Sequence, residues 1–77
     1  MPIKVKFFGS VRETLDRPNL NIDSDGIETA LDVWNQTTDN TPLHDQVLCS
    51  INMEHREFHH QVNDGDEVAF FPPVTGG

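Results

Sequence analysis

Apolar and polar residues alternate at the start of the chain, where lysines separate Ile3, Val5 and Phe7. This period of two predicts a β-strand with one face turned to a core. A shorter alternation at Leu20 and Ile22 predicts a second strand. The charged, proline-containing stretch between them predicts a connection longer than a tight hairpin turn.

The apolar spacing then changes to a helical one, at Ile27, Ala30, Leu31 and Trp34. These positions form one stripe at i, i+3, i+4 and i+7, which predicts an amphipathic helix. Asp25 is suited to cap the helix N-terminus, and Glu28 three residues later completes a capping-box pattern. The helix is expected to fade in residues 37–40, which favour turns, and Pro42 prevents its continuation.

Three further strands are predicted in the last third of the chain. Val47 to Met53 predicts the third strand, Phe58 to Val62 a short strand at the sheet edge, and Glu67 to Phe71 the last strand. Pro72 is expected to end that last strand, because proline has no N–H to donate to a neighbouring strand.

Two polar segments between these strands predict turns. The first is Glu54 to Glu57, and the second is Asn63 to Asp66, with a positive φ expected at Gly65. The resulting order, ββαβββ, predicts an α+β fold. We expect a mixed sheet of four to five strands with one main helix across one face.

The end of the chain reads Pro72-Pro73-Val74-Thr75-Gly76-Gly77. The two prolines prevent further pairing, and the two glycines form a slender end without side chains. Six extended residues reach about 20 Å, which is enough to bring a terminal carboxylate into another protein's active site. We therefore divide the chain into a folded domain, residues 1–71, and a flexible C-terminal tail, residues 72–77. A frayed terminus without a role is the alternative.

Size and charge limit the possible functions. A chain of 77 residues forms one small domain, and its net charge of −8 argues against a nucleic-acid partner. The sequence contains no apolar run typical of a membrane span or a signal peptide, so we expect a cytoplasmic protein without a membrane partner. The lone Cys49 lies in an apolar run and is predicted to be a buried, inert thiol rather than a nucleophile.

The four histidines do not favour a metal site. His59 and His60 are adjacent in a predicted strand and would therefore point to opposite faces. His44 and His55 lie elsewhere in the chain. Because zinc ligands converge from defined spacings, we interpret all four as surface residues and predict no bound metal.

Two pairs of phenylalanines indicate a surface for a partner. Alternation along a strand sends neighbouring residues to opposite faces, so Phe7 and Phe70 are expected under the helix. Phe8, Ala69 and Phe71 then lie on the other face of the sheet. Because one helix covers only one face, an exposed aromatic cluster is expected there, and such clusters mark interfaces. Coverage by loops is the alternative.

Both ends of the chain carry motifs that resemble a known family. These are Asp64-Gly65-Asp66-Glu67-Val68-Ala69-Phe70-Phe71-Pro72-Pro73-Val74-Thr75-Gly76-Gly77 at the C-terminus, Val5-Lys6-Phe7-Phe8-Gly9-Ser10-Val11-Arg12-Glu13 near the N-terminus, and the Ile51-Asn52 step. They resemble the small subunits of molybdopterin synthase, which are ubiquitin-like β-grasp sulfur carriers. The hairpin after Asn52 departs from the family pattern, because its Glu54, His55 and Arg56 are more polar than a partner-facing surface in that family.

The resemblance implies a sulfur carrier whose reacting group is the Gly77 carboxylate. An ATP-dependent activating enzyme would adenylate this carboxylate, and sulfur from a persulfide would replace AMP to leave a thiocarboxylate. The tail would then enter the large synthase subunit, in a heterotetramer of two small and two large subunits. There it would donate sulfur to cyclic pyranopterin monophosphate in molybdenum cofactor biosynthesis.

The chain itself would be the non-catalytic, sulfur-donating subunit of this transferase. It would bind no cofactor apart from the covalent adenylate or thiocarboxylate. The resemblance places Arg12 at the partner interface together with Phe8, Ala69 and Phe71. Three alternatives stay open: a sulfur carrier for another product such as the thiazole of thiamin, a ubiquitin-like modifier joined to lysines, and a plain binding module with an inert tail.

Overall fold

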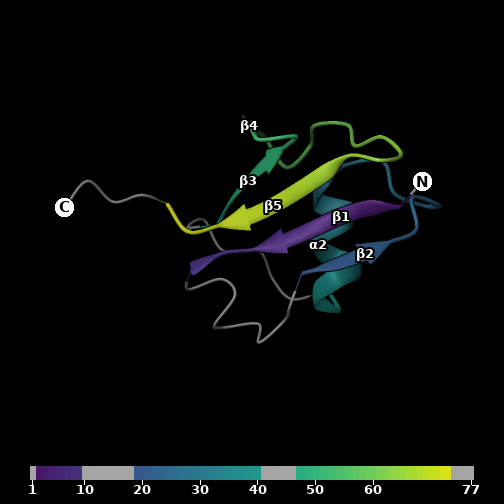
Figure 1. Ribbon diagram of the computed structural model, residues 1–77, viewed down its shortest axis with the longest axis horizontal. Coiled ribbons are helices and arrows are strands. Elements are labelled where there is room, and N and C mark those ends of the chain that lie inside the picture. The colour runs from purple at the N-terminus through teal and green to yellow at the C-terminus, as the bar shows by residue number, and fades with distance from the viewer. Residues whose placement is uncertain (1, 10–18, 41–46, 74–77) are drawn as a thin grey trace.

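The computed structural model describes residues 2–9, 19–40 and 47–73. In this part of the chain, a five-stranded mixed sheet has the strand order β2-β1-β5-β3-β4, and helix α2 lies across one face (Figure 1). The elements are β1 (Ile3–Phe7), β2 (Leu20–Ile22), α2 (Ala30–Thr38), β3 (Leu48–Ile51), β4 (Glu54–Arg56) and β5 (Glu67–Phe71). The predicted order ββαβββ is confirmed, and among the described residues one helix lies on one face of the sheet, as expected.

β5 occupies the centre of the sheet. It forms a parallel pair with β1, in which Phe70 lies opposite Phe7. It forms an antiparallel pair with β3, in which Phe70 lies opposite Cys49. β2 pairs with the outer side of β1, and β4 pairs with the outer side of β3. Pro72 and Pro73, which follow β5, therefore lie at the end of the middle strand of the sheet (Figure 1).

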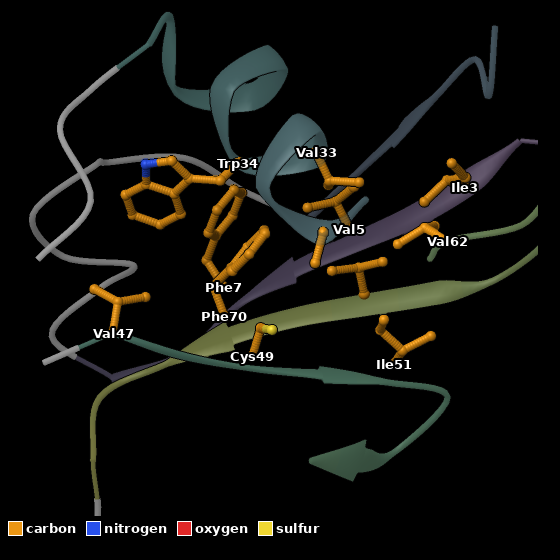
Figure 2. Packing of buried hydrophobic residues seen from close by; sticks show 12 residues of the cluster. Ile3, Val5, Phe7, Val33, Trp34, Val47, Cys49, Ile51, Val62 and Phe70 are labelled. Carbon is orange, nitrogen blue, oxygen red and sulfur yellow. The ribbon is translucent and has the colours of Figure 1, made fainter. Parts of the chain in front are cut away.

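The core lies between the sheet and α2, and aromatic rings fill one end of it (Figure 2). Phe70 is fully buried, and its ring contacts Trp34 edge-on with the centroids 5.1 Å apart. It also stacks on Phe7 at 5.7 Å and on Phe58 at 5.9 Å. Such pairs add about 0.5–1.5 kcal/mol each to the gain from burial alone. The predicted inward direction of Phe7 and Phe70 is confirmed.

The helix begins later than predicted. Its N-cap is Thr29, and the capping box pairs Thr29 with Asp32 rather than Asp25 with Glu28, so the predicted cap is wrong. Asp25 instead lies in a turn and its N–H donates to Asp23 Oδ1 at 3.0 Å. Gly26 then takes a φ of +82°, a conformation through which an α-helix cannot continue. The helix ends at Thr38, as its turn-forming sequence predicted, with Asp39 as the C-cap.

Asp32 holds the start of the helix together. Its carboxylate accepts hydrogen bonds from the N–H groups of Glu28 at 2.9 Å and Thr29 at 3.0 Å. These two bonds hold the pKa of Asp32 below its ordinary value. The depressed pKa means that the carboxylate stabilises the fold above the pKa of the unfolded chain, and that this contribution is lost as the pH falls below about 4.

We therefore expect Asp32→Ala to destabilise the domain by about 1 kcal/mol at pH 7, as removal of a helix cap typically does. The difference from the parent chain should shrink as the pH falls below about 4, because the carboxylate becomes protonated first in the unfolded chain and, at lower pH, in the folded protein. Urea denaturation at several pH values measures both effects. Asp25→Ala is the matched control and should cost less. An equal cost for the two variants would contradict the capping role of Asp32.

A hairpin takes the place of the predicted turn at Glu54 to Glu57. β4 (Glu54–Arg56) is the edge strand, and it pairs with β3 so that Glu54 faces Ile51. The turn consists of Asn52 and Met53, both with positive φ, as a two-residue type I′ turn requires. The Asn52 side chain fixes this turn: its Oδ1 accepts from Glu67 N–H and its Nδ2 donates to Asp66 Oδ1, both at 3.0 Å.

The predicted edge strand at Phe58 to Val62 is also wrong. This segment passes over the start of α2, and its backbone bonds to the helix instead of the sheet. Ala30 N–H donates to His60 O at 3.2 Å, and Leu31 N–H donates to Phe58 O at 2.9 Å. These are among the N–H groups that the first turn of a helix leaves unpaired, so the segment caps the helix from outside. The following turn has the predicted positive φ at Gly65.

Candidate functional site

The C-terminal segment leaves the sheet between two neighbouring strands. On one side, Phe8 N–H donates to Phe70 O at 3.0 Å, and on the other side Phe71 is paired with Leu48. Pro72 and Pro73 follow, half-buried and outside any strand. The predicted end of the strand at Pro72 is confirmed. The sheet thus holds the chain firmly up to the last residue before the tail.

The face of the sheet opposite α2 carries an apolar patch beside this exit. We define the apolar patch as Phe8, Leu48, Ala69, Phe71 and the ring of His55. Phe8 is 49% exposed, and Phe71 and Leu48 are half-buried. The His55 ring lies with its centroid 5.1 Å from that of Phe71. Both Phe8 and Phe71 reach solvent, as expected, and Phe8 does so to the greater extent.

Ala69 lies on the same face but differs from the prediction, because it is only 8% exposed. Its neighbours in the sheet register are Lys6 on β1 and Ser50 on β3. A methyl group does not rise above these longer side chains. Ala69 therefore forms the floor of the apolar patch, and a partner would contact mainly the residues around it.

Two members of the apolar patch were not predicted from the sequence. The sequence did contain a signal for Leu48. It precedes Cys49, whose side chain is in the core, so strand alternation places Leu48 on the opposite face of the sheet. His55 escapes the sequence pattern because its polar segment indicates a turn. Once the turn is placed at residues 52–53, the pairing of His55 with Ser50 brings its ring to this face.

The polar part of this face lies further from the exit. Lys6 Nζ is 3.2 Å from Glu67 Oε1, and both side chains are partly exposed to solvent. Ion pairs of this kind contribute about 0–1 kcal/mol, so this one adds little to stability. It marks the boundary at which the apolar patch gives way to charged residues.

Several predicted site residues lie outside the described part of the chain. These are Val74, Thr75, Gly76 and Gly77 of the tail, together with Arg12. The roles assigned to them, including the flexibility of the tail, stay predictions.

Comparison with known proteins identifies the family. Residues 5–77 match the ThiS family. The chain belongs to the ThiS family. It is 39% identical to the molybdopterin synthase sulfur carrier subunit of Escherichia coli strain K12 over 80 residues, an alignment that covers 97% of this chain and 99% of that protein.

Two solved structures show the same fold as this ThiS-family chain. SAMP1 of Haloferax volcanii is 26% identical, with a TM-score of 0.74 over 100% of both chains. A chain of the complex of subunits 1 and 2 of the molybdopterin-converting factor from Helicobacter pylori 26695 is 21% identical, with a TM-score of 0.65 over 100% of both chains. The predicted ubiquitin-like β-grasp fold and the resemblance to molybdopterin synthase small subunits are thus confirmed.

Cys49 of this ThiS-family chain is buried, as predicted, with 1% of its surface exposed. Its thiol donates to Arg56 O at 3.1 Å, and burial raises its pKa to about 11. Because the thiolate is the reactive form, the folded protein holds this sulfur in an inert state. Any sulfur chemistry at the tail would therefore proceed without competition from Cys49.

We expect Cys49 to resist Ellman's reagent at pH 8 in the folded protein, where about one thiol in a thousand is ionised at a pKa of about 11. Unfolding in guanidinium should make it react fully within minutes. The time course of absorbance with and without denaturant measures the difference. Stoichiometric labelling of the native protein at the denatured rate would contradict the burial of this thiol.

The described histidines fall in two separate places. His55 belongs to the apolar patch, whereas His59 and His60 lie in the segment over the helix start, which is no strand. His44 is outside the described residues. Within residues 2–9, 19–40 and 47–73, no three histidine, cysteine or acidic side chains converge as a metal site would require. In the same part of the chain, no helix is long and apolar enough to cross a membrane.

Proposed function

We propose that this ThiS-family chain is the sulfur carrier subunit of a molybdopterin synthase. The observation that carries the proposal is its 39% identity to the Escherichia coli sulfur carrier subunit over 97% of the chain. The fold supports it, because the central strand β5 ends at a proline pair beside an exposed apolar patch. The domain would dock through the patch while the tail reaches into the partner.

The chemistry takes place at the Gly77 carboxylate. A carboxylate is a poor acyl donor, so an activating enzyme first joins it to AMP from ATP and releases pyrophosphate. The terminal sulfur of a persulfide attacks the acyl carbon and AMP leaves. A thiol then cleaves the resulting acyl disulfide to leave the thiocarboxylate. This group is a strong nucleophile of the kind that covalent catalysis requires. Transfer of two sulfurs to cyclic pyranopterin monophosphate would complete the dithiolene of molybdopterin.

The partners follow from this role. The large synthase subunit would cover the apolar patch and bind the tail, in a heterotetramer of two small and two large subunits. The Helicobacter pylori structure, a complex of subunits 1 and 2 of the molybdopterin-converting factor, supports a second subunit as the partner of this fold. The carrier supplies the sulfur atom, and the large subunit supplies the catalytic side chains.

Reconstitution with defined components tests the proposal. The chain is released from an intein fusion with sulfide, which gives the C-terminal thiocarboxylate, or by hydrolysis, which gives the carboxylate as the matched control. Each form is mixed with the large subunit of the Escherichia coli synthase and cyclic pyranopterin monophosphate. We expect molybdopterin only from the thiocarboxylate form. No product from either form would contradict the proposal.

A ubiquitin-like protein modifier is the second candidate, and the likeness to SAMP1, a small archaeal modifier protein, favours it. In that case the activated glycine would form an isopeptide bond with lysines of other proteins. Isolation of the tagged chain from its own cells distinguishes the two roles. Covalent conjugates that survive denaturation and reduction would support the modifier, whereas a free chain with a thiocarboxylate end supports the carrier.

A further inference from the structure

Gly9 and Pro72 meet where the parallel neighbouring strands β1 and β5 end. Gly9 follows Phe8 and takes a φ of +56°. A Cβ at this position would lie 3.0 Å from Pro72 Cγ and 3.2 Å from Pro72 Cδ. These separations are shorter than ordinary contacts of about 3.5–4.0 Å between carbon atoms. The ring of Pro72 therefore occupies the space that a side chain on Gly9 would need.

Pro72 is a stiff link between the sheet and the tail. Its own ring fixes φ near −65°, and the ring of Pro73 restricts Pro72 to extended conformations. Phe71, which precedes Pro72, is restricted in the same way. Because these bonds can rotate so little, a shift of the Pro72 ring also changes the direction of the chain that follows it.

The neighbouring backbone fixes both partners of this contact. The hydrogen bond from Phe8 N–H to Phe70 O, 3.0 Å long, joins the two strands just before Gly9 and Pro72. The bond holds Phe8, the residue directly before Gly9, in place relative to β5. A Cβ added at Gly9 would therefore press on the Pro72 ring, which would have to give way by a few tenths of an ångström.

We infer that Gly9 is a positioning residue that sets the direction in which the C-terminal tail leaves the sheet. It touches no reacting atom. Because Gly9 has no side chain, the Pro72 ring can lie against it, and Gly9 acts through the position of that ring. The inference rests on the proposed sulfur-carrier function. It adds to that function a residue that helps to direct the terminal carboxylate towards a partner's active site.

The expected effect is large because of the length of the tail. Five extended residues, from Pro73 to Gly77, reach about 17 Å, so a small rotation at Pro72 moves the end by several ångströms. A misplacement of about 1 Å at a reacting group can cost about 100-fold in rate. Part of the displacement is recovered when the tail binds in a partner's channel, so we expect a loss of about tenfold.

The chain offers a matched control at Gly26. This glycine also has a positive φ, of +82°, but a Cβ there would meet no atom within 4 Å. Gly9→Ala and Gly26→Ala therefore impose the same kind of backbone strain, and only the first displaces Pro72. Each variant is prepared as the thiocarboxylate and mixed with saturating Escherichia coli large subunit and cyclic pyranopterin monophosphate, and the single-turnover rate of sulfur transfer is measured.

We expect similar small losses of Tm in both variants, and a rate loss of about tenfold in Gly9→Ala alone. In a Pro72→Ala background, which lacks Cγ and Cδ, the same Gly9→Ala change should have little effect on the rate, as a double-mutant cycle requires of coupled residues. NMR gives an independent readout in the free chain: the resonances of Phe71 and Pro73 should shift in Gly9→Ala and stay unchanged in Gly26→Ala.

Equal transfer rates for Gly9→Ala and Gly26→Ala would overturn the inference, and transfer by the parent chain would leave the proposed function intact. A loss of rate in Gly9→Ala that persists in full in the Pro72→Ala background would also overturn it. If the parent thiocarboxylate itself transferred no sulfur, the proposed function would fail and the positioning role would fail with it.

Discussion

Deletion of Gly77 is expected to abolish sulfur transfer and to leave the folded domain unchanged. The reacting carboxylate belongs to this residue in the proposed mechanism, and its removal shortens the tail by about 3.5 Å. The hydrogen-bonded sheet ends at Phe71, so no described element of the domain includes the deleted residue. Production of molybdopterin in the reconstituted system should fall below detection.

Circular dichroism and thermal unfolding of the same variant should match those of the parent chain. Thr75→Ala is a suitable control, because it alters the tail while it preserves its length and its terminal glycines. It should retain most of the transfer rate. Normal product from the Gly77 deletion would exclude the terminal glycine as the site of sulfur attachment.

The second large effect concerns two adjacent aromatic residues with opposite roles. Phe71→Asp should weaken binding to the large subunit by about 2 kcal/mol or more, which is about 30-fold in Kd, because it places a carboxylate in the apolar patch. Phe70→Asp should unfold the domain. Phe70 is fully buried against Trp34 and Phe7, and a charge there has no compensating partner. A small domain has only a few kcal/mol of stability to lose.

Met53→Asp is the matched control for charge. Met53 is 87% exposed and lies at the β3–β4 turn, at the opposite end of β3 from the pairing of Leu48 with Phe71. It adds the same negative charge to a chain that already carries −8. Calorimetry with and without the large subunit should show parent-like binding for Met53→Asp. Unfolding by Phe71→Asp together with a stable Phe70→Asp would invert the assignment of the two faces.

Much of the fold follows from the sequence because the strands have a clear period of two. Alternation places Phe7 and Phe70 in the core and Phe8 and Phe71 outside it, and all four directions are confirmed. The predictions are wrong where a backbone N–H or C=O group has more than one possible hydrogen-bond partner. The capping pattern of Asp25 and Glu28 is sound in sequence terms, but Gly26 interrupts it and Thr29 offers a second capping box with Asp32.

The hairpin at the sheet edge is harder to predict, because its turn pairs Asn52 with Met53 rather than with glycine. Because the predicted turn included His55, this residue was not predicted to lie at the interface. The segment from Phe58 to Val62 resembles a strand in sequence, because it contains residues that favour strands. Nothing in that pattern indicates that its carbonyl groups accept hydrogen bonds from the start of α2. The contact of Gly9 with Pro72 joins residues far apart in the sequence, so no local pattern indicates it.

The proposed function requires that Gly77 carries sulfur, and the mass of the C-terminal peptide of the native protein shows whether it does. The chain is purified from its own cells without reducing agents, digested, and its last peptide is weighed by high-resolution mass spectrometry. We expect a fraction of this peptide to be heavier by the exchange of one oxygen for sulfur, with fragment ions that place the exchange at Gly77. A peptide found only as the free carboxylate, in cells that are actively making molybdopterin, would contradict the sulfur-carrier function.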